Sequence, residues 1–104
     1  MIRKAFTMKV YASRIDEYVD RHNPIWPTLA DTLSKHGVRN YSIFLDAKTC
    51  CLFGYVEVAS EAKWRALADT EVCRKWWSYM KETMETNPDD SPVSTDLREV
   101  FHLA

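Results

Sequence analysis

The chain has 104 residues, of which 46% are hydrophobic, 12% aromatic and 28% charged, and its formal net charge is -1. A chain of this length can bury one modest hydrophobic core, so residues 1–104 are expected to form a single domain. Because the charge is near zero and basic residues are scattered among acidic ones, we expect no nucleic-acid partner.

The amino-terminal segment predicts a β-strand. Apolar and polar residues alternate from Ile2 to Tyr11, with Phe6, Met8 and Val10 on one face. This alternation has the two-residue period of an extended strand, so the first element is expected to be a strand.

A kinked helical arm is expected next. Ser13, with acidic residues in the following turn, signals the start of a helix, and Asn23-Pro24-Ile25-Trp26-Pro27 interrupts it just after His22. If Asn23 caps a second segment, both prolines fall where a helix needs no N–H donor. This second segment is expected to continue to residue 36, and Gly37 is expected to end it.

Two β-branched and aromatic runs, Val38 to Asp46 and Cys50 to Ala59, predict a hairpin with a short loop. Both of its faces are apolar. One face is expected to hold Phe44, Leu52, Val56 and Val58, and the other Tyr41, Ile43, Leu45, Phe53 and Tyr55.

The remaining third of the chain predicts helices followed by a strand. Ser60 caps a short helix that ends near residue 68, and a second helix begins at position 69 or 70 with a wide apolar face reaching Met84. Residues 86–92 have the composition of a loop, and the alternation from Leu97 to Leu103 predicts a last strand. The order βαββαβ, with the second helix in two pieces, is the ferredoxin-like α+β arrangement.

The two-sided apolar hairpin also predicts an assembly. In a ferredoxin-like fold both helices cover the same sheet face, and strands that are apolar on both faces are buried on both sides. The chain has no residues left to cover the second face. We therefore expect a homodimer packed sheet against sheet, as in a dimeric α/β barrel.

The location of the protein is predicted from its apolar runs and its cysteines. Every apolar run is far shorter than the length of about 20 residues that a membrane-spanning helix needs. The amino terminus also lacks the hydrophobic region of a signal peptide. Cys50, Cys51 and Cys73 are odd in number and form no CxxC motif, so neither a disulfide framework nor a thiolate metal site is expected. We expect a cytoplasmic protein with no membrane partner.

Histidine is the first candidate for chemistry. His22 follows Tyr18 by four residues, which places both on one side of the first helical segment. An imidazole has an ordinary pKa of about 6.5, which suits general acid or base catalysis near neutral pH. The competing interpretation is that His22 is a hydrogen-bonded structural histidine. His36 is interpreted as a cation at a helix carboxyl end, and His102 has no identified partner. The three histidines lack metal-ligand spacing, so no metal is expected.

The pair Trp76-Trp77 is the second unusual feature. Adjacent helical side chains point about 100° apart, so one of the two indoles should lie at a rim or cleft. An indole at a cleft offers a flat apolar face and an N–H donor, which suits a sugar ring or a planar heterocycle. The alternative is that both are buried in the dimer core. No phosphate-binding loop, GxSxG motif or paired-carboxylate signature is present, so phosphoryl, acyl and hydride transfer lack support.

Four segments carry a resemblance to a known family. They are Arg21-His22-Asn23-Pro24-Ile25-Trp26-Pro27, Val72-Cys73-Arg74-Lys75-Trp76-Trp77, Asn87-Pro88-Asp89-Asp90-Ser91-Pro92-Val93-Ser94 and Glu99-Val100-Phe101. The chain resembles the L-rhamnose mutarotases in these segments, and the similarity runs through all 104 residues. The resemblance implies a ferredoxin-like fold, dimers formed through the sheets, and interconversion of the α and β anomers of L-rhamnose.

The resemblance also implies roles for individual residues. His22 would be the catalytic proton donor, and Tyr18, Tyr41, Trp76 and Trp77 would contact the sugar. Opening and closing a hemiacetal ring requires no cofactor, so none is expected. An aromatic residue such as Tyr is expected at the position of His102, which we therefore place outside the site.

Two other functions remain open at this point. Cofactor-less monooxygenases share the fold and would also use a pocket of His and Trp, and a non-enzymatic dimer could bind a small ligand in the same place.

Overall fold

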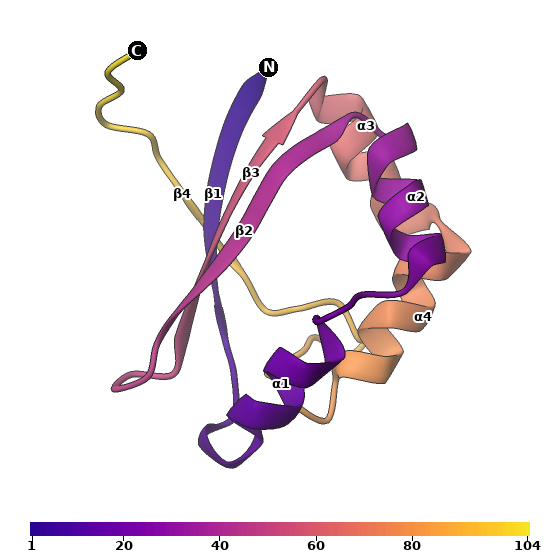
Figure 1. The fold of residues 1–104 in the computed structure, drawn as a ribbon, viewed down its shortest axis with the longest axis vertical. Coiled ribbons are helices and arrows are strands. Elements are labelled where there is room, and N and C mark those ends of the chain that lie inside the picture. The colour runs from indigo at the N-terminus through magenta and orange to yellow at the C-terminus, as the bar shows by residue number, and fades with distance from the viewer.

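A four-stranded antiparallel sheet forms one layer of the protein in the computed structural model, which describes residues 1–104, and the helices all lie against one face of it (Figure 1). The strands are β1 (Ile2–Lys9), β2 (Val38–Asp46), β3 (Cys51–Val58) and β4 (Thr95–Leu97). Their order across the sheet is β2-β3-β1-β4, and every neighbouring pair is antiparallel. This is the ferredoxin-like α+β fold that the sequence predicts.

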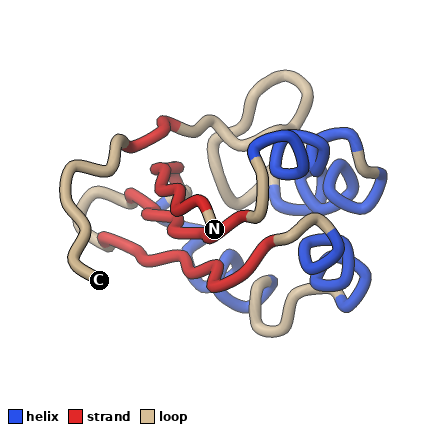
Figure 2. The backbone as a smooth tube through the Cα atoms, turned by 90° about the horizontal axis from the view of Figure 1, so that it is seen from above, coloured by secondary structure: helices blue, strands red, loops and turns tan.

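The helices form the second layer, which Figure 2 shows beside the sheet from above. They are α1 (Ile15–Arg21), α2 (Pro27–Lys35), α3 (Glu61–Ala66) and α4 (Glu71–Met80), with 3₁₀ turns η1 (Ala12–Arg14) and η2 (Leu67–Asp69). Ser60 caps α3 as predicted, because its hydroxyl accepts a hydrogen bond from the Lys63 backbone N–H at 3.1 Å. Gly37 ends α2 as predicted, at a φ of 76° that favours glycine.

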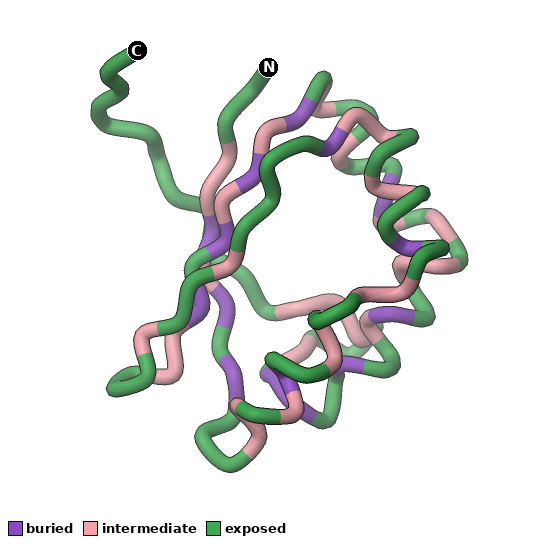
Figure 3. Tube along the Cα trace, viewed as in Figure 1, coloured by how far each residue is buried: buried purple, intermediate pink, exposed green.

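The hydrophobic core lies between the two layers, where Figure 3 shows the buried positions. The face of β1 that carries Phe6, Met8 and Val10 is buried there, as predicted. Leu52 and Val56 of β3 are almost fully buried beside it. Each such aliphatic side chain contributes about 1.5–3 kcal/mol on burial, so this one layer of contacts holds the helices on the sheet.

The helical arm bends just after His22, but Asn23 does not cap the second helix. The Asn23 side-chain amide instead donates a hydrogen bond to the Val19 carbonyl at 2.8 Å, so it covers the end of α1. Helix α2 begins at Pro27, whose missing N–H falls in the first turn, where no partner exists. At the other end of α1, Ser13 makes no capping bond and lies within the turn η1.

The hairpin has nearly the expected strands but not the expected pairing of faces. Phe44 lies opposite Phe53, and Leu45 opposite Leu52. Phe44 and Phe53 therefore share the face that points away from the helices, and the prediction that Phe44 lies with Leu52 is wrong. The turn fixes this register, and a shift of one residue moves a side chain to the other face.

A β-bulge decides where Tyr41 points. The pairing of β2 with β3 shifts between Arg39 and Ser42, and Asn40 there has a φ of 49°. The extra residue reverses the alternation, so buried Val38 and Tyr41 both lie on the helix side. Tyr41 is therefore on the face opposite Phe44, as predicted.

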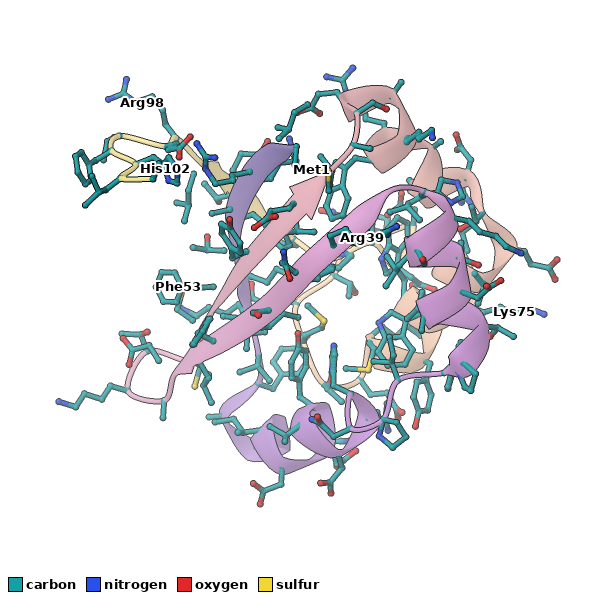
Figure 4. The ribbon with its side chains drawn as sticks, turned by 45° about the horizontal axis from the view of Figure 1, so that its top comes forward. Met1, Arg39, Phe53, Lys75, Arg98 and His102 are labelled. Atoms are coloured by element: carbon teal, nitrogen blue, oxygen red, sulfur yellow. The ribbon has the colours of Figure 1, made fainter.

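The last helix is shorter than predicted, and the predicted strand from Leu97 to Leu103 is wrong, because the strand observed there is Thr95–Leu97 and residues 98–104 form no strand. Strand β4 pairs with β1 only between Thr95 and Leu97, although β1 itself extends to Ile2 beyond that point. Residues 98–104 form an exposed tail that carries Arg98 and His102, and Glu99 ties it to Arg3 of β1 at 2.8 Å (Figure 4). Helix α4 ends at Met80, and Met84 is buried by a bridge to Val10 instead of by the helix.

Gly54 is expected to tolerate no side chain. A Cβ at this position would lie 2.5 Å from the ring of Phe6, which occupies the space above the glycine. We expect Gly54→Ala to lower the free energy of unfolding by about 1–3 kcal/mol, the usual cost of overpacking a core. Urea unfolding followed by circular dichroism measures this. Lys48→Ala, in the exposed hairpin turn, is the control, and equal stabilities of the two variants would contradict the prediction.

Candidate active site

A cavity of about 980 Å³ lies between the sheet and the helices. All five candidate residues line it: Tyr18, His22, Tyr41, Trp76 and Trp77. They come from α1, its carboxyl end, β2 and α4, so the fold brings together positions that are more than 50 residues apart in sequence. The volume lies at the upper end of the range of about 300–1,000 Å³ that small-molecule sites span.

His22 stands at the carboxyl end of α1 and faces two aromatic rings. Its ring centroid is 4.4 Å from that of Tyr18 and 5.2 Å from that of Trp76, which it meets edge to face at 90°. His22 Nδ1 is 2.8 Å from the backbone oxygen of Tyr18, one helical turn earlier. The imidazole is thus held by one nitrogen at the end of α1 and by two aromatic neighbours, Tyr18 and Trp76.

This hydrogen bond defines the tautomer of His22. A carbonyl oxygen can only accept, so Nδ1 carries the hydrogen and Nε2 of the neutral ring has a free lone pair. Burial lowers the pKa of His22, and the bond to Tyr18 opposes that shift only in part. Near neutral pH the imidazole is therefore uncharged, with Nε2 available as a base.

The two adjacent tryptophans take different positions. Trp76 is 9% exposed and packs edge-on against Trp26, whereas Trp77 is half-buried beside the core. Both line the cavity from α4, which lies on the helix side of the sheet. A sheet-to-sheet interface would therefore not bury them, which disfavours the interpretation that they belong to a dimer core.

Tyr18 and Tyr41 bring two hydroxyl groups to the same cavity. Desolvation raises the pKa of both phenols well above the ordinary value, so both keep their protons near neutral pH. The Tyr18 hydroxyl is not left fully buried without a hydrogen-bond partner, and the Tyr41 residue as a whole remains 37% exposed. The Tyr41 ring contacts Phe6 and Trp64, with centroids 6.2 Å away in each case. The two phenols can therefore donate hydrogen bonds to a ligand.

The sequence alone did not place Trp64 and Cys73 in the site. Trp64 lines the cavity from α3, and Cys73 lines it from α4. Burial raises the pKa of the Cys73 thiol to about 11, so it stays protonated. No periodicity marks either residue, because their access to the cavity depends on how α3 and α4 lie on the sheet.

A polar wall comes from the segment between α4 and β4 and from Asp96 within β4. Its lining residues are Thr86, Asn87, Asp89, Asp90, Ser91, Pro92, Ser94 and Asp96. The Asn87 backbone N–H donates to the Ser91 carbonyl at 2.7 Å, and Thr86 forms a bridge with Pro92. The predicted loop is thus tied to itself and supplies the hydrogen-bonding side of a cavity that is otherwise largely apolar.

The other two histidines lie outside the cavity. His36 ends α2, where Nδ1 donates to the Thr32 carbonyl at 2.8 Å, and His102 is on the exposed tail. No three His, Cys, Asp or Glu side chains come together in a way that could hold a metal ion.

The fold and the cavity define a class of protein: a small ferredoxin-like α+β domain with a cavity lined by indoles, phenols and a neutral imidazole. The family model for L-rhamnose mutarotase matches residues 3–103. The L-rhamnose mutarotase of Tolumonas auensis is 59% identical over 104 residues, which is all of both chains. The chain belongs to the L-rhamnose mutarotase family.

Solved structures agree with this assignment. The crystal structure of L-rhamnose mutarotase from Formosa agariphila is 40% identical, covers all of both chains and has a TM-score of 0.93. A proposed antibiotic biosynthesis monooxygenase from Nitrosomonas europaea has a TM-score of 0.65 over 97% of this chain and all of that chain, at 10% identity. This second likeness shows the fold alone, and neither the monooxygenase nor the non-enzymatic alternative is favoured.

The state of His22 can be measured directly. We expect its pKa to lie below the ordinary value of about 6.5 and its neutral form to carry the hydrogen on Nδ1, because it is buried and bonded to the Tyr18 carbonyl. Nitrogen-15 NMR through a pH titration reports both properties. A neutral ring protonated on Nε2, or a raised pKa, would contradict this description.

The same shift has a consequence for stability. The unfolded chain binds the His22 proton more tightly than the folded protein does, so stability is complete above about pH 6.5 and is lost as the pH falls through the lowered pKa. We expect His22→Gln to lose this part of the pH dependence. Unfolding experiments with both proteins at a series of pH values test it, and identical slopes for the two would rule it out.

Proposed function

We propose that this cavity is where the chain interconverts the α and β anomers of L-rhamnose, and that His22 carries the proton transfers. The chain is a carbohydrate isomerase by its family. The observation that supports the role of His22 is its bond to Tyr18, which leaves Nε2 unprotonated in a cavity shared with Trp76. His22, which the resemblance implies as the proton donor, therefore has to accept a proton on Nε2 before it can donate one.

The reaction starts with the neutral imidazole. Nε2 of His22 takes the proton of the anomeric hydroxyl while the bond between C1 and the ring oxygen breaks, and the imidazolium then gives that proton to the ring oxygen. Both oxygens are bonded to C1, so one nitrogen can serve them in turn. The aldehyde rotates about the C1–C2 bond, and the reverse transfers close the ring on the other face of C1.

This sequence of steps balances within the site. No proton is gained or lost overall and no electrons are exchanged, so an uncharged base that becomes an acid after one transfer is the only titrating group required. Positioned acid–base catalysis contributes typically about 10²–10⁴ in rate. That range is substantial for a ring opening that already proceeds slowly in water.

The other four candidates would hold the sugar. An indole of Trp76 or Trp77 offers a flat surface for the C–H face of the ring, and the phenols of Tyr18 and Tyr41 would donate hydrogen bonds to its oxygens. The C6 methyl of rhamnose suits this aromatic wall better than a hydroxymethyl group would. Holding the ring by its face leaves C1 free to meet Nε2.

Anomer exchange tests the role of His22. We expect His22→Ala to reduce the enzyme-catalysed exchange of L-rhamnose by about 10²–10⁴, because the acid–base group is removed. NMR saturation transfer between the two anomers at constant pH measures it. His36→Ala is a matched control, because His36 makes the same bond to a carbonyl four residues earlier but lies outside the cavity. Retention of wild-type exchange by His22→Ala would refute the assignment.

We also propose a homodimer of two 104-residue domains. The sheet face that points away from the helices exposes Phe44 (68%), Phe53 (41%) and Leu97 (44%), and Phe53 projects from it in Figure 4. A second copy packed sheet against sheet would cover these side chains and leave both cavities on the outer, helical sides.

Sedimentation velocity tests the dimer at micromolar concentration. We expect the wild type to sediment with twice the mass of one chain and Phe44→Glu to sediment as a monomer, because a charge would be buried in the interface. Tyr11→Glu replaces an equally large exposed aromatic outside the sheet and should remain dimeric. A wild type that sediments as one chain would exclude the proposal.

A cytoplasmic site of action is proposed as well. It is supported by the three cysteines, all of which are free thiols and fit a reducing compartment. None of the helices has the length and apolar content needed to cross a lipid bilayer.

A further inference from the structure

The carboxyl ends of α1 and α4 are joined by one side chain, Arg21, which directly precedes His22. Its guanidinium donates to the backbone carbonyl of Tyr79 in α4 and to a carboxylate oxygen of Glu82 at 2.8 Å. On its own helix it donates to Glu17 at 3.2 Å. No backbone hydrogen bond links α1 to α4. Arg21 therefore makes the hydrogen-bonded connection between the helix of His22 and the helix of Trp76.

The flat guanidinium group also stacks on an aromatic ring. Its central carbon lies 4.4 Å from the centroid of the Tyr79 ring, and the Arg21 side chain is only 16% exposed. Arginine presents several donors in a rigid plane, so it can bind a carbonyl and carboxylates while stacking, which lysine cannot do. This places the cation on the turn of α4 that follows Trp76.

A closed ring of contacts returns from this turn to the imidazole. The Tyr79 ring lies 5.7 Å from Trp76, and Trp76 lies 5.2 Å from His22, centroid to centroid. Arg21 and His22 are neighbours at the end of α1, and they contact Tyr79 and Trp76, which lie one turn apart on α4. The contact between Tyr79 and Trp76 closes the ring. The distance between His22 and Trp76 therefore depends on their own contact and on the neighbouring contact of Arg21 with Tyr79.

The ionic part of this connection is the weaker part. Glu82 and Glu17 have side chains that are 54% and 46% exposed, so solvent and salt screen their attraction to Arg21. The bond to the Tyr79 carbonyl and the stack on its ring do not depend on a second charge. Arg21 therefore acts mainly through its hydrogen bond to the Tyr79 carbonyl and its stack on the Tyr79 ring, and less through its charge.

We propose that Arg21 is a positioning residue for the reaction: it holds the end of α1 against α4 so that Nε2 of His22 meets a sugar held by Trp76. The kinetic part of this inference rests on the proposed function. A displacement of about 1 Å at a reacting group can cost about 10²-fold in rate, so a small shift of α1 is enough to matter. Arg21 itself does not line the cavity.

Arg21→Gln is the test, and Arg14→Gln is its matched control. Arg14 also donates to Glu17, at 2.8 Å, but reaches no residue of α4. We expect kcat for anomer exchange to fall about 10- to 100-fold in Arg21→Gln, with KM changed less than about threefold, because of the four proposed sugar contacts only Tyr18 lies on α1. Arg14→Gln should keep wild-type kcat. Polarimetry of freshly dissolved L-rhamnose at several concentrations gives both constants.

A second readout is independent of activity. The edge-to-face contact of His22 with Trp76 produces a nuclear Overhauser effect between the two rings and a ring-current shift on the imidazole C–H protons. Both should weaken in Arg21→Gln and persist in Arg14→Gln. If the wild type does not catalyse anomer exchange, the proposed function fails, and this readout still decides whether Arg21 sets the contact.

The outcomes separate positioning from stability alone. A variant with a lower melting temperature but wild-type kcat and wild-type NMR signals at a temperature where it is folded would overturn the proposal. If Arg21→Gln does not fold, Arg21→Lys decides, because it keeps the charge and loses the stack and the planar donors. We expect it to show a smaller loss of the same two signals, and wild-type values in both would overturn the proposal.

Discussion

The end of helix α1 at His22 is the constraint on which the site depends. Because the helix stops there, the imidazole is not enclosed by a further turn, yet its Nδ1 still reaches the Tyr18 carbonyl as a helical neighbour would. One nitrogen is thereby occupied by the backbone and the other is left for chemistry. Asn23 covers the open end of the helix through its bond to Val19, so the termination is satisfied without a residue that would block the cavity.

Burial keeps the imidazole, the two phenols and the thiol of the cavity uncharged. Desolvation lowers the pKa of His22 and raises those of Tyr18, Tyr41 and Cys73, which in each case favours the neutral form. A neutral base beside neutral donors matches the opening of a hemiacetal, which moves protons between oxygens of one uncharged molecule. The same burial that builds the core therefore prepares the chemistry, and an exposed site with these residues would not.

The sheet separates the site from the proposed interface. Its helix side carries the cavity, and its other side carries Phe44 and Phe53. Each strand contributes to both, because alternate side chains point to opposite faces. Two functions can thus occupy one small sheet, and the bulge at Asn40 is what assigns Tyr41 to the first of them.

The sequence by itself determined the order of elements, the strands of the hairpin, the bend after His22 and the Ser60 cap, because these depend on residues three or four apart or on strict alternation. The five candidate residues were found by spacing and by resemblance, and all of them line one cavity. Tertiary structure decided the rest. It set which faces of the hairpin share a side, through the register of the turn, and it placed the last strand at Thr95–Leu97, where the chain pairs with β1, instead of at Leu97–Leu103. It brought Trp64 into the cavity and Arg21 onto Tyr79. Such contacts join distant parts of the chain, and no local periodicity encodes them.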